Sequence, residues 1–483
     1  EREGVPRKRV GIGAGGRGSD FGRGIIDAPA PYTLGRRKSI PGKENVFMWA
    51  YESVFYQIYP LGFCGAPAEN DGVTVPRIRK VLEWIPHIRR LHAGAVYFCP
   101  VFESDRHGYD TRDFTRVDCR LGSNEDFAAV CAALHEAGIR VVLDGVFHHV
   151  GRGFWAFQDV LRRRENSPYK DWFFLRFDGD NRYGDGLWYE GWEGHEELVK
   201  LNLRNEQAAA HLLESVRGWV EAYGIDGLRL DVAYSLDPDF LRRLRETCDG
   251  LKPDFFLVGE MLHGDYNRLL GDSLLHSVTN YECYKGLYSS FNSRNLFEIA
   301  HSLQRQFGPE SWTLYKNRHL LCFADNHDVT RIASIIQNPQ HLEILYALLF
   351  SMPGIPCLYY GSEWGAKGVK GGGDDAPLRP CFDKPEETAL TGWIARLAAL
   401  HREQPALCYG DYRTLCLTNE QLVFRRRFEN QTVIVAINAA EQPYTAHFDA
   451  EAGRGVELLT GSSHDFGGGS VLPPYSVAYW RTA

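Results

Sequence analysis

Eight short apolar runs, separated by helix-like segments, constrain the fold of this chain more strongly than any other feature. The runs begin at residues 54, 95, 140, 227, 255, 277, 319 and 355. They are rich in β-branched and aromatic residues, and intervening stretches such as NEDFAAVCAALHEAGI have the apolar period of an amphipathic helix. Runs that are apolar throughout are typical of parallel strands covered on both faces. The alternation therefore predicts an α/β fold, namely a (β/α)8 TIM barrel.

The rest of the chain divides around this barrel. Residues 1–46 are rich in Gly and Arg without apolar periodicity, and we predict a flexible tail outside the fold. The barrel is expected at 47–404, with a loop subdomain inserted at 150–202, where Trp, Tyr, Gly and Asp are dense. Alternating short strands separated by turns over 405–483 predict a C-terminal antiparallel β-sandwich.

One motif in the tail resembles a nucleotide-binding signature. GIGAGG, residues 11–16, matches GxGxxG, but that fingerprint is meaningful only between a strand and a helix of a βαβ unit. Because RKRV precedes the motif and RGSDFGRG follows it, we interpret it as a chance match in a flexible segment.

Composition excludes several classes of protein. A net charge of −8 argues against nucleic acid as a partner, and no apolar stretch approaches the ~20 residues that cross a bilayer. The N-terminus has no apolar segment of signal-peptide type. Eleven cysteines is an odd number, and none forms a CxxC pair, which favours a reduced, cytoplasmic protein without structural zinc.

Charged residues cluster where the predicted strands end. The carboxyl ends of the third, fourth, fifth and seventh strands carry Asp144, His148, His149, Arg229, Asp231, Glu260, Asn326, His327 and Asp328. In a (β/α)8 barrel these ends meet at one mouth, where the active site lies. Each residue alone has a structural interpretation as a helix cap or a satisfied core group, and a purely structural barrel is the alternative. Four acids at strand ends that meet at one mouth repel one another, however, and burial destabilises such charges further unless they are paired.

Two of these carboxyl groups have the surroundings of a glycosidase pair. Arg229 and Asp231 are two residues apart, so on a strand they point to the same face, and Arg229 is expected to keep Asp231 ionised as a nucleophile. Glu260 lies among apolar neighbours and like charges, which favour the protonated form of a general acid. Such a pair around a sugar-sized pocket is typical of glycoside hydrolysis.

The motifs at these strand ends resemble the α-amylase superfamily, glycoside hydrolase family 13. DGVFHH, GLRLDVAYS, FLVGE and FADNHD look like the family's four ordered motifs, and the likeness covers about residues 50 to 400. The sandwich after them fits the family's C-terminal domain. LVKLN at 198–202 looks most like the neopullulanase, cyclomaltodextrinase and maltogenic amylase subfamily.

The resemblance implies a role for each matching residue. Asp231 would be the nucleophile of a β-glycosyl-enzyme intermediate, Glu260 the acid and base, and Asp328 would hold substrate hydroxyls and favour a distorted ring. The implied substrate-binding residues are Tyr109 beneath the ring, Asp144 and Arg229 as supports, His149 and His327 at hydroxyl groups, and Asp375 and Arg379 from GGGDDAPLRP.

The activity that follows is retaining hydrolysis of α-glucosidic bonds in maltodextrins or cyclodextrins, α-1,4 with α-1,6 as a further linkage. No organic cofactor is implied. The expected partner is an α-glucan oligosaccharide, with no nucleic acid and no membrane, and the chain could be a monomer or a homo-oligomer. A glucosyltransferase or isomerase on the same scaffold is the nearest alternative, and a non-catalytic glucan-binding or partner protein is a remote one.

Departures from the family pattern limit what the resemblance implies. His148 replaces an Asn that supports calcium in many amylases, so no metal ligands are assigned, although the turn at 70–72 faintly resembles another calcium loop. Tyr234 and Ser235 replace the Lys-His of typical α-amylases, which disfavours endo-action on long starch. The tryptophans of the insertion leave two interpretations open, extra sugar subsites or a small core of their own.

Overall fold

The computed structural model describes residues 47–373 and 375–482, so the predicted tail and its GIGAGG motif lie outside the described residues. Each of the eight apolar runs contains a parallel strand, which confirms the predicted barrel. These strands are β1 (Phe55–Ile58), β2 (Ala95–Phe98), β5 (Arg140–Gly145), β11 (Gly227–Leu230), β12 (Phe256–Gly259), β13 (Ser277–Val278), β14 (Leu321–Phe323) and β15 (Ile355–Tyr359). Their order in the sheet is β13-β12-β11-β5-β2-β1-β15-β14, and a parallel bridge between Thr279 and Leu321 nearly closes it.

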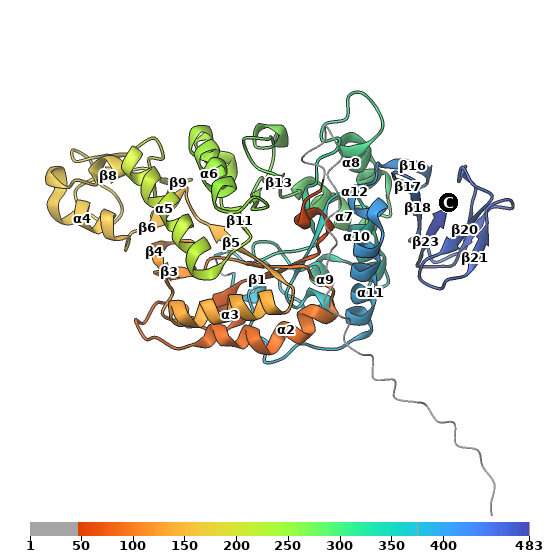
Figure 1. Cartoon of the computed structure of the whole chain (residues 1–483), viewed down its shortest axis with the longest axis horizontal. Helices are drawn as coiled ribbons and strands as arrows, with labels where there is room; N and C mark the ends of the chain where they lie inside the picture. Colours follow the sequence, from red (N-terminus) through yellow and green to blue (C-terminus); the bar gives the residue numbers. More distant parts are fainter. Residues whose placement is uncertain (1–46, 374, 483) are drawn as a thin grey trace, which may run out of the picture. The chain divides into compact units, whose positions relative to one another are not determined.

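Helices follow the strands along the chain and cover the barrel (Figure 1). They are α1 (Pro60–Phe63), α2 (Lys80–Arg90), α3 (Asn124–Glu136), α5 (Glu206–Tyr223), α6 (Pro238–Leu251), α7 (Tyr281–Asn292), α8 (Phe297–Phe307), α9 (Ile332–Ile335), α10 (His341–Ser351), α11 (Ala389–Glu403) and α12 (Pro405–Tyr409). Local sequence signals fix several starts: Ser123 and Asp126 form a capping box before α3, and Asn205 and Asp237 cap α5 and α6.

The connections after β2 and β5 form small antiparallel sheets. β3 (Phe102–Ser104) pairs with β4 (Thr111–Val117), and the inserted region contains β6 (His149–Gly151), α4 (Trp155–Arg163), β7 (Leu175–Arg176), β8 (Trp188–Tyr189), β9 (Gly191–Trp192) and β10 (His195–Lys200). Within the insertion, β6, β10 and β9 form one sheet and β7 and β8 another.

The tryptophans of the insertion divide between the two interpretations that the sequence left open. Trp155 packs edge-on against Tyr169, Trp172 and His211, with ring centroids 4.9–5.5 Å away. Trp172 itself is buried. These rings form a local core, whereas Trp192 lies elsewhere, beside His149.

The C-terminal region is an antiparallel β domain, as predicted. Its strands are β16 (Arg413–Leu417), β17 (Gln421–Phe428), β18 (Gln431–Asn438), β19 (Tyr444–Ala446), β20 (Arg454–Glu457), β21 (Ser463–Asp465), β22 (Ser470–Leu472) and β23 (Ser476–Thr482). Six form the sheet β16-β17-β18-β23-β20-β21, and β19 and β22 form a second. The Tyr479 hydroxyl donates to the Ala347 carbonyl in α10 and thereby joins this domain to the barrel. The exact domain boundaries stay predictions.

Two further observations bear on the sequence analysis. All eleven cysteines fall in the described region as free thiols, and all but Cys381 and Cys416 are buried. Among the described helices, none combines the length and the apolarity that a bilayer crossing requires.

Candidate active site

One guanidinium organises the carboxyl ends of three neighbouring strands. Arg229 is paired in register with Asp144 of β5 and with Val258 of β12, and its side chain is almost fully buried. Nη1 lies 2.9 Å from Asp144 Oδ1 and 2.8 Å from Asp231 Oδ1, and Nη2 lies 3.0 Å from Glu260 Oε1. Arg229 is therefore shared by three acids rather than by Asp231 alone.

This sharing affects the protonation of both expected catalytic carboxyl groups. Burial raises the pKa of Asp231 well above its usual range, and Arg229 opposes that shift while Glu260 adds to it. Burial likewise raises the pKa of Glu260, against Arg229 and with the help of the Asp328 charge. The raised pKa of Glu260 agrees with the expectation of a protonated acid. The raised pKa of Asp231 runs against the expectation that Arg229 keeps this acid ionised, because Arg229 is shared with Asp144 and Glu260. Because one guanidinium cannot fully compensate both groups, they titrate as a pair.

Asp144 lies below the mouth. Its side chain is fully buried, and Oδ2 accepts hydrogen bonds from the hydroxyls of Tyr97 and Tyr109, each at 3.1 Å. Burial raises the pKa of Asp144, which Arg229 counteracts. The geometry suits a support for Arg229 and Tyr109 better than a direct sugar contact.

The third acid, Asp328, sits in a cationic environment. His327 Nε2 lies 2.9 Å from Asp328 Oδ2, and Arg379 Nη2 lies 3.0 Å from Oδ1 and 3.1 Å from Asp375 Oδ2. Burial favours the protonated acid, but His327 and Arg379 hold the pKa of Asp328 well below its usual range. Burial also opposes the charge on His327, yet Asp328 raises the pKa of that imidazole to about 10. Asp328 is therefore the permanently ionised acid of the site.

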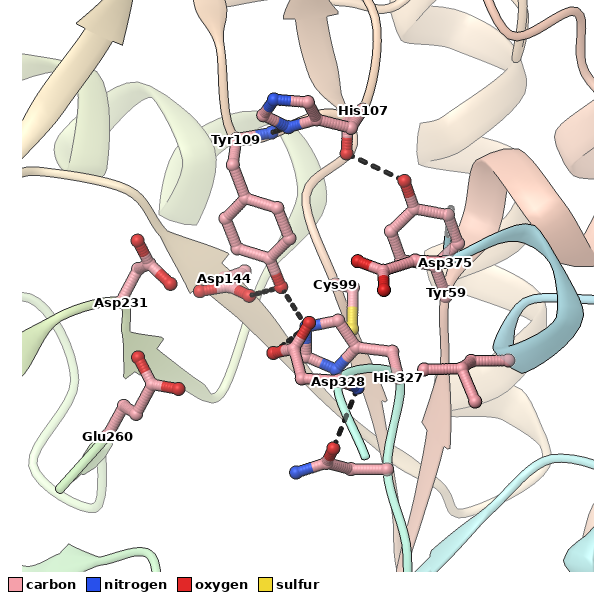
Figure 2. Close-up of polar contacts among 12 residues, drawn as sticks. Tyr59, Cys99, His107, Tyr109, Asp144, Asp231, Glu260, His327, Asp328 and Asp375 are labelled. Carbon is pink, nitrogen blue, oxygen red and sulfur yellow. Dashed lines mark hydrogen bonds and ion pairs between the residues drawn. The ribbon is translucent and has the colours of Figure 1, made fainter. Parts of the chain in front are cut away.

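Tyr109 and His149 lie beside the acids. The Tyr109 ring stacks on His327 with centroids 5.6 Å apart, and Figure 2 shows the carboxyl groups of Asp231 and Glu260 grouped together, across from Asp328. His149 Nε2 lies 3.9 Å from Asp231 Oδ2 and has no hydrogen-bond partner among the described residues, although it is buried. Burial lowers the pKa of His149 well below its usual range, so a neutral imidazole is available to a ligand hydroxyl.

The structure thus joins every candidate residue of the sequence analysis into one network. The members are Tyr109, Asp144, His149, Arg229, Asp231, Glu260, His327, Asp328, Asp375 and Arg379.

Two side chains outside this set of candidates also lie near the site. The Gln57 amide lies 2.9 Å from His327 Nδ1, opposite Asp328, and it could have been found as the one polar residue in the apolar run VFYQIYP. The ring of Trp192 lies 6.1 Å from that of His149. Trp192 comes from the insertion, and no pattern in the sequence places it there.

A hairpin tip of the insertion also touches the segment after Asp231. Trp192 pairs with His195, so Glu193 and Gly194 form a two-residue loop with φ of 46° and 87°. Positive φ at both positions is typical of a type I′ turn, which glutamate rarely adopts. The Glu193 carboxylate accepts a hydrogen bond of 3.2 Å from the Tyr234 hydroxyl, three residues beyond Asp231.

The residues around His148 do not fit a calcium ion. Nδ1 of His148 lies 3.2 Å from Nδ1 of His149, and burial lowers the pKa of His148 to about 4. Calcium prefers six to eight oxygen ligands, whereas this position presents imidazole nitrogen beside Lys200.

A buried arginine lies beside the turn at 70–72, where Glu103, Asp118 and Cys119 bring their side-chain ligand atoms within 4.8 Å of one another. Arg120 is completely buried and donates to the carbonyl oxygens of Pro67, Ala68 and Arg106 and to the Asp118 carboxylate. Side-chain oxygens near this turn are hydrogen-bonded as well: the Asn70 amide donates to Glu103 Oε1 at 2.8 Å. The guanidinium therefore compensates the buried Asp118 carboxylate, which disfavours a further cation at this group.

The fold and the site together define a class of protein. A (β/α)8 barrel with two buried carboxyl groups around one guanidinium at its carboxyl end has the architecture of a barrel glycosidase. Residues 57–406 match the family described as alpha amylase, catalytic domain, and residues 410–465 match the alpha-amylase C-terminal domain. The chain belongs to the α-amylase family and is a glycoside hydrolase.

Known relatives give the same picture. A cyclomaltodextrinase of Geobacillus thermopakistaniensis is 29% identical over 473 residues, which cover 89% of this chain and 77% of the relative. Neopullulanase 2 of Thermoactinomyces vulgaris is 31% identical over 430 residues, 80% of this chain and 72% of the relative. Among solved structures, the cyclic alpha-maltosyl-(1→6)-maltose hydrolase of Arthrobacter globiformis superposes with a TM-score of 0.76 at 26% identity, covering 90% of this chain and all of that one.

Proposed function

We propose that the protein is a retaining α-glucoside hydrolase that degrades maltodextrins or cyclodextrins through a β-glycosyl-enzyme intermediate. The observation that carries the proposal is the contact of Asp231 and Glu260 with the two Nη atoms of one guanidinium, at 2.8 and 3.0 Å. That contact keeps the two carboxyl groups close together, as a retaining mechanism requires, with a typical separation of about 5–5.5 Å.

In the first step, the Glu260 carboxyl donates its proton to the glycosidic oxygen as the bond to the anomeric carbon breaks. An Asp231 carboxylate oxygen forms the new bond to that carbon, and the shortened glucan leaves with the proton of Glu260. In the second step, the Glu260 carboxylate takes a proton from water, the water oxygen bonds to the anomeric carbon, and Asp231 is released. Two inversions give an α-configured product.

The remaining residues bind and orient the sugar ring at the cleavage point. Tyr109 provides an aromatic face, and the neutral Nε2 of His149 meets a hydroxyl group. The ionised Asp328, held by His327 and Arg379, stabilises positive charge on the ring in the transition state. All proton and bond changes use protein carboxyl groups and water, so the proposal requires no organic cofactor and assigns no step to a metal.

Relatives and composition support the proposed substrate and compartment. Relatives named cyclomaltodextrinase and maltogenic alpha-amylase support short linear or cyclic α-1,4 glucans, and the Arthrobacter neighbour, named for a substrate with a 1→6 bond, supports α-1,6 bonds as well. A relative named intracellular maltogenic amylase, from Bacillus subtilis, and the free cysteines support a cytoplasmic location.

Product analysis tests the proposal. Maltoheptaose, β-cyclodextrin and pullulan are incubated with the protein, with Asp231→Asn, and with Asp239→Asn, a matched change at an exposed acid of α6. Proton NMR should show α-configured maltose or glucose from the unmodified protein and from Asp239→Asn only. A first product in the β configuration overturns the retaining mechanism, and longer or rearranged sugars make the protein a transglycosylase. Binding without cleavage by the unmodified protein would support the non-catalytic alternative.

A further inference from the structure

A small cavity lies at the amino end of the barrel strands, opposite the candidate active site. Its lining includes His319 and Gly354, which come just before β14 and β15, whereas the candidate catalytic acids follow the carboxyl ends of their strands. Its other wall belongs to α12 and β17, which pack together (Figure 1). The cavity therefore lies between the barrel and the C-terminal domain, and no member of the site network lines it.

The volume of the cavity, about 120 Å³, limits what can occupy it. Pockets for small organic ligands usually measure ~300–1,000 Å³, so a buried sugar ring does not fit here. A water molecule takes about 30 Å³ of the liquid, so an ion of a few heavy atoms does fit. The cavity thus has the size of a site for a small inorganic ion.

A buried guanidinium without a carboxylate partner lines this cavity. Arg426 of β17 is 1% exposed. Its Nη1 donates to the Ser351 carbonyl at 2.7 Å, and its Nε and Nη2 donate to the carbonyls of Gly410 and Asp411 at 3.0–3.2 Å. These bonds engage three of its five N–H groups, and it forms no ion pair with a described carboxylate. A buried charge of this kind destabilises the fold unless a counter-ion is near.

The one acid among the described lining residues, Asp411, is bound to other groups. Its Oδ2 lies 2.9 Å from Arg425 Nη2, and its Oδ1 accepts a hydrogen bond of 2.9 Å from the Arg427 backbone amide. Burial lowers the pKa of Arg426 to about 10, although Cys408 and Asp411 oppose that shift. The protein therefore leaves the charge of Arg426 incompletely compensated.

Further basic groups border the same cavity. Lys316 and Arg318 belong to the loop before β14, and neither forms an ion pair with a described residue. The Lys316 ammonium lies 3.4 Å from the carbonyl oxygen of Pro309. His319 adds no charge at physiological pH, because burial and Arg426 lower its pKa to about 3. Three permanent positive charges thus accompany one acid in the lining, which favours an anion.

We propose that this cavity binds a small oxyanion, inorganic phosphate, through Arg426, Arg318 and Lys316. The oxygens of phosphate can accept hydrogen bonds from the two remaining N–H groups of Arg426, and such charge-assisted bonds are strong. Arg426 belongs to the C-terminal domain and Arg318 precedes a barrel strand, so the bound anion joins the two domains and stabilises them against unfolding. The inference is independent of the proposed hydrolase function.

Thermal unfolding and calorimetric titration with phosphate test the inference. Replacing sodium chloride by sodium phosphate at constant pH and ionic strength should raise Tm by about 2 °C, because the ion binds only the folded state. Arg318→Ala and Lys316→Ala should each weaken phosphate binding about tenfold and leave kcat on maltoheptaose unchanged. Arg426→Met also removes three carbonyl contacts, so the two loop residues give the cleaner test.

Arg116→Ala is the matched control, because Arg116 is an exposed arginine of β4 that forms no ion pair with a described residue. It should keep the Tm shift and the phosphate affinity of the unmodified protein. Glucose 6-phosphate, whose ring exceeds the cavity, should raise Tm less than phosphate does. The inference is overturned if phosphate and chloride give the same Tm, if Arg318→Ala and Lys316→Ala both keep the full shift, or if the sugar phosphate binds as tightly as the inorganic ion.

Discussion

At the amino end of β11 one aspartate faces three basic side chains, whereas at its carboxyl end one arginine faces three acids. Asp226 lies 2.9 Å from His135 Nε2, 2.8 Å from Arg140 Nη1 and 2.7 Å from Lys252 Nζ. Arg229, three residues later, is shared by Asp144, Asp231 and Glu260.

The two arrangements shift the pKa values of their carboxyl groups in opposite directions. Burial raises the pKa of an acid at either end, but at Asp226 the hydrogen bonds from His135 and Lys252 outweigh burial and depress the pKa far below its usual range. At Asp231 and Glu260 the single shared guanidinium does not outweigh burial, so the pKa values of both acids lie above their usual range. At the amino end of β11 the basic groups neutralise Asp226 and stabilise the fold. At the carboxyl end the acids outnumber the guanidinium, so one of them can hold and release a proton, as acid–base chemistry requires.

The largest expected effect comes from Asp231→Asn. Without a nucleophile, kcat should fall at least about 10³-fold, because covalent catalysis is lost. The free energy of unfolding should stay within about 1 kcal/mol of the unmodified protein, since removing one acid relieves repulsion around Arg229. Steady-state kinetics and urea unfolding measure the two quantities. Strong destabilisation would show that the mouth is held together by its charges, as the opposite end is.

Asp226→Asn should produce the reverse pattern. Three basic groups lose their counter-charge, so the free energy of unfolding should fall by about 2–3 kcal/mol, less than for a fully buried pair because His135, Arg140 and Lys252 are about one-third exposed. The kcat of the folded fraction should be unchanged. A lower kcat at full folding would contradict the assignment of this end to stability.

The pH dependence of stability should differ in sign between the two ends. Asp226 has a lowered pKa when folded, so its contribution is present above the unfolded pKa of about 4 and is lost as the pH falls. Glu260 has a raised pKa when folded, so it favours folding most at acid pH and opposes it as the pH rises above about 4.

Urea unfolding between pH 3 and pH 8 checks this prediction. The free-energy deficit of Asp226→Asn should shrink toward pH 3, whereas Glu260→Gln should become more stable than the unmodified protein toward pH 8. Parallel curves for all three proteins would remove the distinction between the ends of β11.

The smallest effect is expected from removing divalent metal. Arg120 is a buried charge compensated by the Asp118 carboxylate and by three carbonyl oxygens, so the cation that these oxygens bind is a guanidinium. Excess chelator should therefore leave activity and Tm unchanged, while Arg120→Met should cost about 3 kcal/mol because Asp118 loses its buried partner. A fall in Tm with chelator that calcium reverses would refute this interpretation.

Much of the fold and of the site could be predicted from local sequence. Strands such as β12 are short, apolar on both faces and bounded by turns, so their positions can be predicted from the residue types of each run. Because parallel strands end at one edge, residues that follow them, such as Asp231 and Glu260, could be placed together without knowledge of strand order.

What could not be predicted depends on register and on inserted segments. That Arg229 reaches Glu260 as well as Asp231 requires β11 to lie beside β12 in a particular register. The approach of Trp192 to His149 requires the path of a long insertion, which has no short-range periodic signal. The buried Arg120 donates hydrogen bonds to carbonyl oxygens of separate loops, and the positions of backbone oxygens cannot be predicted from residue types.

Rescue by azide tests the central claim, the division of roles between Asp231 and Glu260, most directly. Asp231→Ala and Glu260→Ala are each supplied with sodium azide and a maltosyl donor whose leaving group needs no protonation, α-maltosyl fluoride. In Asp231→Ala, azide can displace fluoride from the face that the carboxylate has vacated, and the account predicts β-maltosyl azide. In Glu260→Ala, the intermediate on Asp231 still forms, and azide attacks it without a base to give α-maltosyl azide. The same azide configuration from both variants, or rescue of neither, would contradict the assignment of nucleophile and acid on which the account depends.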